Sequence, residues 1–220
     1  MKKISEHLTT LIKNPLSVIV RTSTRQNAYR VIKNTVSNGF KFVEVTLTVP
    51  EAYEVIKQAR QEFPTAIIGA GTVLTIKDAQ EAIKAGAQYL VSPVYSPEIL
   101  KWSLKNDILY VPGVMTVNEM YSAYNAGAQL LKFYPAVSVP PEVFQLIANP
   151  FPNFKILATG GITLENMEAY FKSGILAVGI TGKLGGANDD DRDEDIAKLA
   201  KQYVKKLADI MKERDEQNGN

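Results

Sequence analysis

The sequence predicts an α/β fold, a single (β/α)8 TIM barrel with an N-terminal helix, and two observations carry this prediction. Eight short runs of β-branched or other apolar residues recur at nearly equal intervals along the 220-residue chain. Each interval holds a segment with apolar residues at helical spacing. Strictly alternating units form either an open doubly wound sheet or a closed barrel, and eight near-equal repeats favour the barrel.

The N-terminal residues 1–14 are expected to form a short amphipathic helix. One face of this helix would carry Ile4, Leu8, Leu11 and Ile12. The segment has no uninterrupted apolar run, so no signal peptide is expected.

The eight expected strands are short and rich in Val, Ile, Leu and Phe, as buried strands of a parallel sheet are. They cover residues 17–20, 42–47, 66–70, 89–92, 108–111, 130–134, 155–159 and 175–180.

Several helix starts have recognisable signals. Pro50 follows the second strand, and Thr116 with Glu119 three residues later matches a capping box. Thr163, which precedes Leu164 and Glu165, predicts a further helix start.

The last helix is expected to begin in the acidic run NDDDRDED, because negative charge stabilises a helix N-terminus. The run lacks the spacing and the glycine of a calcium loop, so it is interpreted as a solvated cap. Its apolar face comprises Ile196, Leu199, Tyr203, Leu207 and Ile210. Residues 212–220 have no such face and are expected to fray, so residues 1–220 are interpreted as one domain with a loose tail.

Composition excludes several classes of function. With 45% hydrophobic and 22% charged residues and a net charge of +2, the chain has no global attraction to nucleic acid or to an anionic membrane. Its apolar runs are too short to span a bilayer. The absence of cysteine fits a cytoplasmic protein and rules out thiolate chemistry. The single histidine, His7, has no cluster around it, so no metal and no cofactor are predicted.

In a barrel, ligands bind at the carboxyl ends of the strands, so charged residues there are functional candidates. Lys132 lies inside the otherwise apolar run QLLKFYPA, with Leu130 and Tyr134 on the same side of the strand. It either extends to solvent or lies in a dry interior, where the neutral amine that attacks a carbonyl is favoured. Lys132 is therefore the candidate nucleophile.

Glu44 is a second charged residue in an apolar strand, between Val43 and Val45. It is either a structural partner of a buried lysine or, if it faces the same mouth as Lys132, a general acid/base. An amine and a carboxylate together suffice for imine chemistry.

Anion-binding features follow other strands. Arg21 ends the first strand, Thr72 follows the third, Gly160 and Gly161 follow the seventh, and GITGKLGG follows the eighth. Glycines after the last two strands of a barrel often expose backbone N–H groups to a phosphate, although a plain tight turn is the alternative. GAGTVL and TGKL do not match the dinucleotide and P-loop motifs.

At these residues the sequence resembles the aldolase family that cleaves 2-keto-3-deoxy-6-phosphogluconate (KDPG) and 2-keto-4-hydroxyglutarate (KHG). The matching segments are VEVTLTVP, IIGAGTVLT, YLVSP, YVPGVMT, LLKFYPA, TGGIT and LAVGI. The resemblance implies a class I aldolase on a (β/α)8 barrel, a cytoplasmic homotrimer that needs no metal.

The resemblance also implies a role for each site residue. Lys132 would form the Schiff base with a keto acid, and Glu44 would be the general acid/base. The pyruvoyl carboxylate would be held by Arg21 and Thr72, and the distal, phosphate-binding end would be lined by Thr159, Gly160, Gly161, Thr181 and Gly182.

Three positions depart from the family pattern. Thr48 stands where some members have arginine, Gly182 where a serine commonly meets the phosphate, and Val137 where many members have an acidic residue. These positions would contact the two ends of the substrate, whereas the two residues implied to be catalytic are unchanged.

The function expected is therefore cleavage of a 2-keto-4-hydroxy acid, KDPG or KHG, to pyruvate and glyceraldehyde 3-phosphate or glyoxylate. Two alternatives stay open: a sugar-phosphate isomerase or epimerase with an electrostatic Lys132, and a non-catalytic barrel that binds a keto acid.

Overall fold

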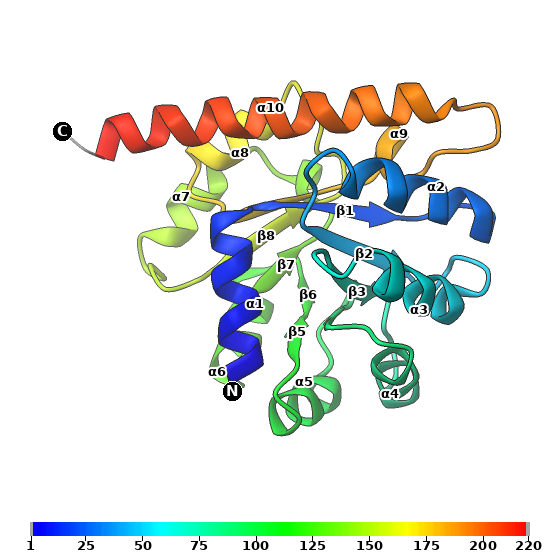
Figure 1. Ribbon diagram of the computed structural model, residues 1–220. Coiled ribbons are helices and arrows are strands. Elements are labelled where there is room, and N and C mark those ends of the chain that lie inside the picture. Colours follow the sequence, from blue (N-terminus) through cyan, green and yellow to red (C-terminus); the bar gives the residue numbers. More distant parts are fainter. Residues whose placement is uncertain (1, 219–220) are drawn as a thin grey trace.

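A computed structural model describes residues 2–218 of the chain, and within this range one parallel sheet forms the centre of the molecule. Its order is β5-β4-β3-β2-β1-β9-β8-β7-β6, and every pairing is parallel. Helices surround the sheet on its outer side (Figure 1). The predicted barrel with an N-terminal helix is confirmed.

The strands coincide with the eight predicted runs, with one addition. They are β1 (Leu16–Val20), β2 (Phe42–Thr46), β3 (Ile67–Gly71), β4 (Tyr89–Val91), β5 (Leu109–Val111), β6 (Gly113–Val114), β7 (Leu131–Phe133), β8 (Ile156–Thr159) and β9 (Ala177–Ile180).

The additional strand β6 closes the barrel. β5 pairs with β4, whereas β6, which follows after Pro112, pairs with β7. The backbone N–H of Lys132 donates to the carbonyl of Pro112 at 2.8 Å. Residues 109–114 therefore act as one barrel strand whose two halves bond to different neighbours.

The helices alternate with the strands. They are α1 (Lys2–Lys13), α2 (Arg25–Val36), α3 (Ala52–Glu62), α4 (Ile76–Lys84), α5 (Pro97–Lys105), α6 (Val117–Asn125), the 3-10 helix Ala136–Ser138, α7 (Val143–Ala148), α8 (Met167–Lys172), α9 (Gly182–Gly185) and α10 (Asp193–Asn218).

Two predictions about the helices need correction. The helix expected after Thr163 begins only at Met167, because Thr163 first forms a turn in which its backbone N–H donates to the Asn166 side chain. Ile12, placed on the buried face of α1, is 42% exposed. Of residues 212–220, which are expected to fray, residues 212–218 belong to α10, Lys212 is exposed, and residues 219–220 lie outside the described residues. The capping box of Thr116 and Glu119 is confirmed.

The acidic run before α10 is held by one arginine of α2. The Arg30 guanidinium bonds the Asp193 carboxylate at 2.8 Å and the backbone carbonyls of Asn188 and Asp191. Asp193 lies in the first turn of α10, where its charge stabilises the helix N-terminus.

Two apolar clusters divide the molecule. The larger cluster lies between the sheet and the surrounding helices. The smaller one fills the barrel interior at the amino ends of the strands, where Ile4, Leu8 and Leu11 of α1 pack on Phe42 and Tyr89. α1 therefore covers one end of the barrel (Figure 1).

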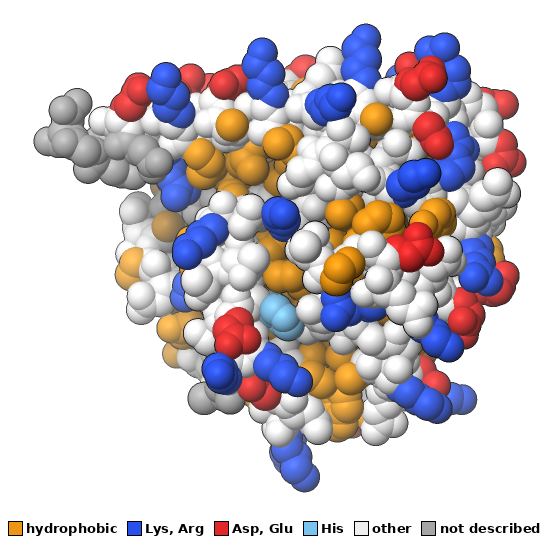
Figure 2. Space-filling model, viewed as in Figure 1, with side chains coloured by type: hydrophobic (Ala, Val, Ile, Leu, Met, Phe, Trp, Pro, Cys, Tyr) orange, Lys and Arg blue, Asp and Glu red, His pale blue; other side chains and the backbone are white. Residues whose placement is uncertain are grey.

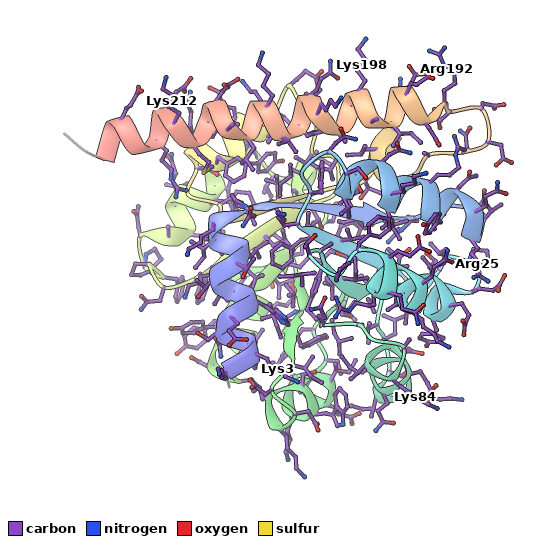
Figure 3. The ribbon with its side chains drawn as sticks, in the orientation of Figure 1. Lys3, Arg25, Lys84, Arg192, Lys198 and Lys212 are labelled. Carbon is purple, nitrogen blue, oxygen red and sulfur yellow. The ribbon has the colours of Figure 1, made fainter. Side chains whose placement is uncertain are left out.

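The outer side of the helix layer is charged. Lys and Arg side chains lie along the exposed side of α10 (Figure 2), and Lys198 and Lys212 point away from the barrel (Figure 3). Across residues 2–218, no helix is long and apolar enough to cross a membrane.

Candidate active site

Lys132 and Glu44 meet inside the barrel, although three strands separate β7 from β2 in the sheet. Lys132 Nζ donates a hydrogen bond to Glu44 Oε1 at 3.3 Å, and the two side chains are 5% and 1% exposed. Burying either charge alone is costly, so each group needs the opposite charge of the other to be buried here. Lys132 does not extend to solvent, and Glu44 faces the same part of the barrel interior. This contact fits both a structural ion pair and an amine beside a general acid/base.

The Lys132–Glu44 pair lies next to the apolar interior of the barrel, two residues further toward the carboxyl ends of the strands. Side chains two residues apart on a strand face the same side, and Phe42 and Leu130, two residues before Glu44 and Lys132, belong to the apolar cluster that α1 covers. The pair therefore lies on the carboxyl side of that cluster, where barrel enzymes bind their substrates.

Tyr134 completes the surroundings of the lysine. Lys132 Nζ is 5.7 Å from the centre of the Tyr134 ring, within the range of a cation–π interaction. Tyr134 is 38% exposed, so it forms part of the boundary between the buried amine and the solvent.

Arg21 and Thr72 come together at the ends of the two strands that flank β2. Arg21 Nη2 lies 3.5 Å from Thr72 Oγ1, at the long limit of a hydrogen bond. Thr72 has a φ of 60°, a backbone conformation that strains a β-branched residue and is often kept at functional sites. The Arg21 side chain is exposed and can receive an anion. Thr48, where some members have arginine, bonds Thr46 at 2.9 Å instead.

The glycines expected at the distal end lie beside the segment that follows the lysine strand. Gly160 and Gly161 have φ values of 88° and 83°, which an L side chain rarely adopts. A Cβ on Gly161 would lie 2.9 Å from Val137 Cγ2, so Val137 packs directly on this loop. The Val137 side chain is 57% exposed and brings no charge to the loop.

Thr159, Thr181 and Gly182 lie at the ends of the neighbouring strands β8 and β9. Thr159 is fully buried, and no partner accounts for its Oγ1. Gly182 has a φ of 44° and begins α9. The residues predicted for the distal end are therefore adjacent along one edge of the barrel mouth.

Metal ligands are not clustered in the part of the chain that the structure describes: it contains no group of three or more His, Asp or Glu side chains able to hold a metal ion. His7 lies on α1, at the amino end of the barrel and away from Lys132.

Sequence reasoning assigned no role to two residues beside the pair, Tyr134 and Gly71. The alternation of the strand predicts Tyr134 on the same side as Lys132, but the position of its ring 5.7 Å from Lys132 Nζ is known only from the structure. Gly71 lies against the Glu44 carboxylate, because a Cβ on Gly71 would be 2.7 Å from Glu44 Cδ. The motif GAGT contained the signal, since a glycine weakens a strand unless something approaches it closely.

The known proteins to which this chain is similar belong to one family. The family model described as KDPG and KHG aldolase matches residues 8–201. The KHG/KDPG aldolase of Escherichia coli (strain K12) is 32% identical over 200 residues, which cover 88% of this chain and 92% of that protein.

Solved structures agree with this match. The 2-keto-3-deoxy-6-phosphogluconate aldolase of Zymomonas mobilis ATCC 29191 superposes with a TM-score of 0.80 at 28% identity, covering 89% of this chain and 95% of that chain. The KDPG aldolase of Legionella pneumophila, solved with pyruvate captured as a covalent carbinolamine intermediate, superposes with a TM-score of 0.78 at 26% identity, covering 88% and 96%.

Proposed function

Because the chain belongs to the KDPG and KHG aldolase family of class I aldehyde-lyases, we propose that it cleaves a 2-keto-4-hydroxy acid to pyruvate and an aldehyde. The proposed substrates are KDPG, which would release glyceraldehyde 3-phosphate, and KHG, which would release glyoxylate. The observation that carries the proposal is the buried contact of 3.3 Å between Lys132 Nζ and Glu44 Oε1.

Lys132 is the proposed nucleophile. Transfer of one proton from Lys132 to Glu44 leaves a neutral amine, whose lone pair attacks the C2 carbonyl carbon of the substrate. Glu44 returns the proton to the carbonyl oxygen and gives a carbinolamine. Loss of water then forms an iminium ion between C2 and Lys132, which is an electron sink for the next step.

Glu44 is the proposed general base of the cleavage. Its carboxylate removes the proton of the C4 hydroxyl group, the C3–C4 bond breaks, and the aldehyde departs. The electron pair of that bond neutralises the iminium as an enamine. Protonation at C3 and hydrolysis then release pyruvate and restore the lysine.

The remaining residues are proposed to hold the two ends of the substrate. Arg21 is exposed and lies beside Thr72, which fits a site for the pyruvoyl carboxylate. The distal end is assigned to Thr159, Gly160, Gly161, Thr181 and Gly182, which lie at or just after the carboxyl ends of β8 and β9, where barrels commonly bind phosphate. Lys183, next to Gly182, is exposed and adds a positive charge near this end.

Two measurements test the proposed function. A retro-aldol assay, in which pyruvate formation is coupled to a dehydrogenase, should show turnover of KDPG, KHG or an unphosphorylated analogue. Borohydride reduction in the presence of pyruvate should add the adduct mass at Lys132. Turnover without borohydride sensitivity, or an adduct on another lysine, would contradict the assignment of Lys132.

The resemblance also leads us to propose a cytoplasmic homotrimer in which residues 1–220 form one domain. Light scattering of the purified protein should give three times the chain mass of 24.3 kDa. A monomer at assay concentrations that retains full turnover would contradict the trimer without affecting the proposed chemistry.

A further inference from the structure

Strand β3 carries glycine at two inward-facing positions, Gly69 and Gly71. Neither has a positive φ, so the backbone conformation does not require glycine at either position. Strands favour β-branched and aromatic residues, and an interior glycine weakens a strand. The reason for glycine at these two positions must therefore be the space that neighbouring side chains occupy, and not the backbone conformation.

Each of the two glycines makes room for a different side chain. A Cβ on Gly71 would lie 2.6 Å from Glu44 Cγ and 2.7 Å from Glu44 Cδ, and closer still to Oε1. A Cβ on Gly69 would lie 2.5 Å from Cδ1 and Cζ of the Tyr89 ring. All these separations are far shorter than van der Waals contacts.

We propose that Gly71 is a positioning residue for the reaction, because the carboxylate of Glu44 occupies the space that any side chain at position 71 would need. This inference rests on the proposed function, in which Glu44 transfers the protons. The strands β2 and β3 pair directly, with Glu44 opposite Gly69 and Thr46 opposite Gly71. The Glu44 side chain thus leans toward the carboxyl end of β3, and this inclination holds Oε1 at 3.3 Å from Lys132 Nζ.

The two glycines should respond differently to the same substitution. The Glu44 carboxylate is the end of a flexible side chain and can rotate away from a methyl group at position 71. The Tyr89 ring is 4% exposed and packs edge-on against Phe42 at 5.8 Å, so it has no comparable freedom. Gly71→Ala should therefore reduce catalysis, whereas Gly69→Ala should reduce stability.

The test is Gly71→Ala in the wild-type protein and in a Glu44→Ala background. In the wild type it should lower retro-aldol kcat by about 10²-fold, the lower end of what a positioned acid/base contributes. KM should stay within about threefold, and borohydride should still attach pyruvate to Lys132. In the Glu44→Ala background the methyl group meets no carboxylate, so the same substitution should change kcat by no more than about twofold.

The matched control is Gly69→Ala, two residues earlier on the same face of the same strand. It should lower the Tm more than Gly71→Ala does, and the folded enzyme should lose less kcat. Equal losses of kcat from Gly71→Ala in both backgrounds, or no loss in the wild type, would overturn the proposal. A raised KM with unchanged kcat would also overturn it, because the effect would then act through the neighbouring Thr72.

A double-mutant cycle of melting temperatures tests the same contact without relying on activity. Gly71→Ala should lower the Tm of the wild type but not that of Glu44→Ala, in which the methyl group fills vacated space. If Gly71→Ala does not fold, its folding in the Glu44→Ala background would support the proposal, and its failure there would overturn it. An inactive wild type that still shows this coupling would refute the proposed function and retain the spatial role of Gly71.

Discussion

The two ends of the barrel interior are built by the same strands and have opposite characters. On β2, the apolar Phe42 is followed two residues later by Glu44, and on β8 Leu157 is followed by Thr159. The first member of each pair lies in the apolar cluster covered by α1, and the second is a buried polar residue.

Position along a strand, not the choice of face, therefore separates the apolar part of the interior from the part that is proposed to be reactive. Residues two apart share a face, so both members of a pair point into the barrel. Only the carboxyl end opens to loops that can admit a substrate. Substitutions at the two ends should therefore affect different quantities.

The largest effect is expected from Lys132→Ala at the carboxyl end. Without the amine no Schiff base forms, so retro-aldol turnover should fall by at least about 10⁴-fold, and borohydride should attach no pyruvate. The control is Lys155→Ala, an exposed lysine before the amino end of β8, which should leave turnover unchanged. Substantial activity of Lys132→Ala would contradict the assignment of Lys132 as the nucleophile.

Glu44→Gln should have the next largest effect. The amide keeps the size of the side chain but cannot accept the C4 hydroxyl proton, so kcat should fall by about 10²–10⁴-fold. Single-turnover kinetics would divide the loss between Schiff-base formation and cleavage, because Glu44 is proposed to transfer protons in both steps. A kcat near that of the wild type would reduce the Lys132–Glu44 contact to a structural ion pair.

At the opposite end, Leu11→Ala should reduce stability and spare the chemistry. Leu11 is 3% exposed beneath the barrel, so its truncation should lower the free energy of unfolding by about 2–5 kcal/mol. Its neighbour Ile12 is 42% exposed, and Ile12→Ala should cost less than about 0.5 kcal/mol. Urea unfolding measures both, and a large loss of kcat in folded Leu11→Ala would show that the two ends are not independent.

Arg21→Ala should affect binding at the mouth. Loss of a charge-assisted hydrogen bond to the substrate carboxylate, worth about 1.5–3 kcal/mol, should lower kcat/KM by about 10–150-fold, mainly through KM. Arg25, which follows the same strand but pairs with Glu51 at 2.9 Å, provides the control, because Arg25→Ala removes a positive charge without touching the proposed site. Equal losses from both variants would indicate a general effect of charge.

The smallest effect is expected from pH at the amino end, through His7 of α1. Burial lowers the pKa of His7 from its ordinary 6.5, with smaller and opposing contributions from Glu6, Lys3, Arg60 and Asp107. The folded state then binds the proton more weakly than the unfolded state, so the contribution is complete above about pH 6.5 and is lost as pH falls toward the folded pKa.

Calorimetry of the free protein should therefore show a Tm that falls by a few degrees at most between about pH 7.5 and 5.5. His7→Gln should reduce this fall, because it removes the titrating group. An equal fall in both proteins would assign the pH dependence to groups elsewhere in the chain.

Several elements could be predicted because their signal is local. The eight apolar runs became strands within one or two residues at most ends, and the capping box of Thr116 and Glu119 formed as expected. The two-residue strand β6 could not be predicted, since only its pairing with β7, itself dependent on barrel closure, makes it a strand. The exposure of Ile12 depends in the same way on how α1 lies across the barrel.

The sequence by itself determined the fold class, the family resemblance and the identity of the two unusual charges, because hydrophobic periodicity and motif spacing are properties of neighbouring residues. Only the tertiary structure decided that Lys132 and Glu44, 88 residues apart, lie 3.3 Å from each other. It also decided that the Glu44 carboxylate lies over Gly71, a contact between adjacent strands. Such contacts depend on the register and closure of the whole barrel, which no local pattern encodes.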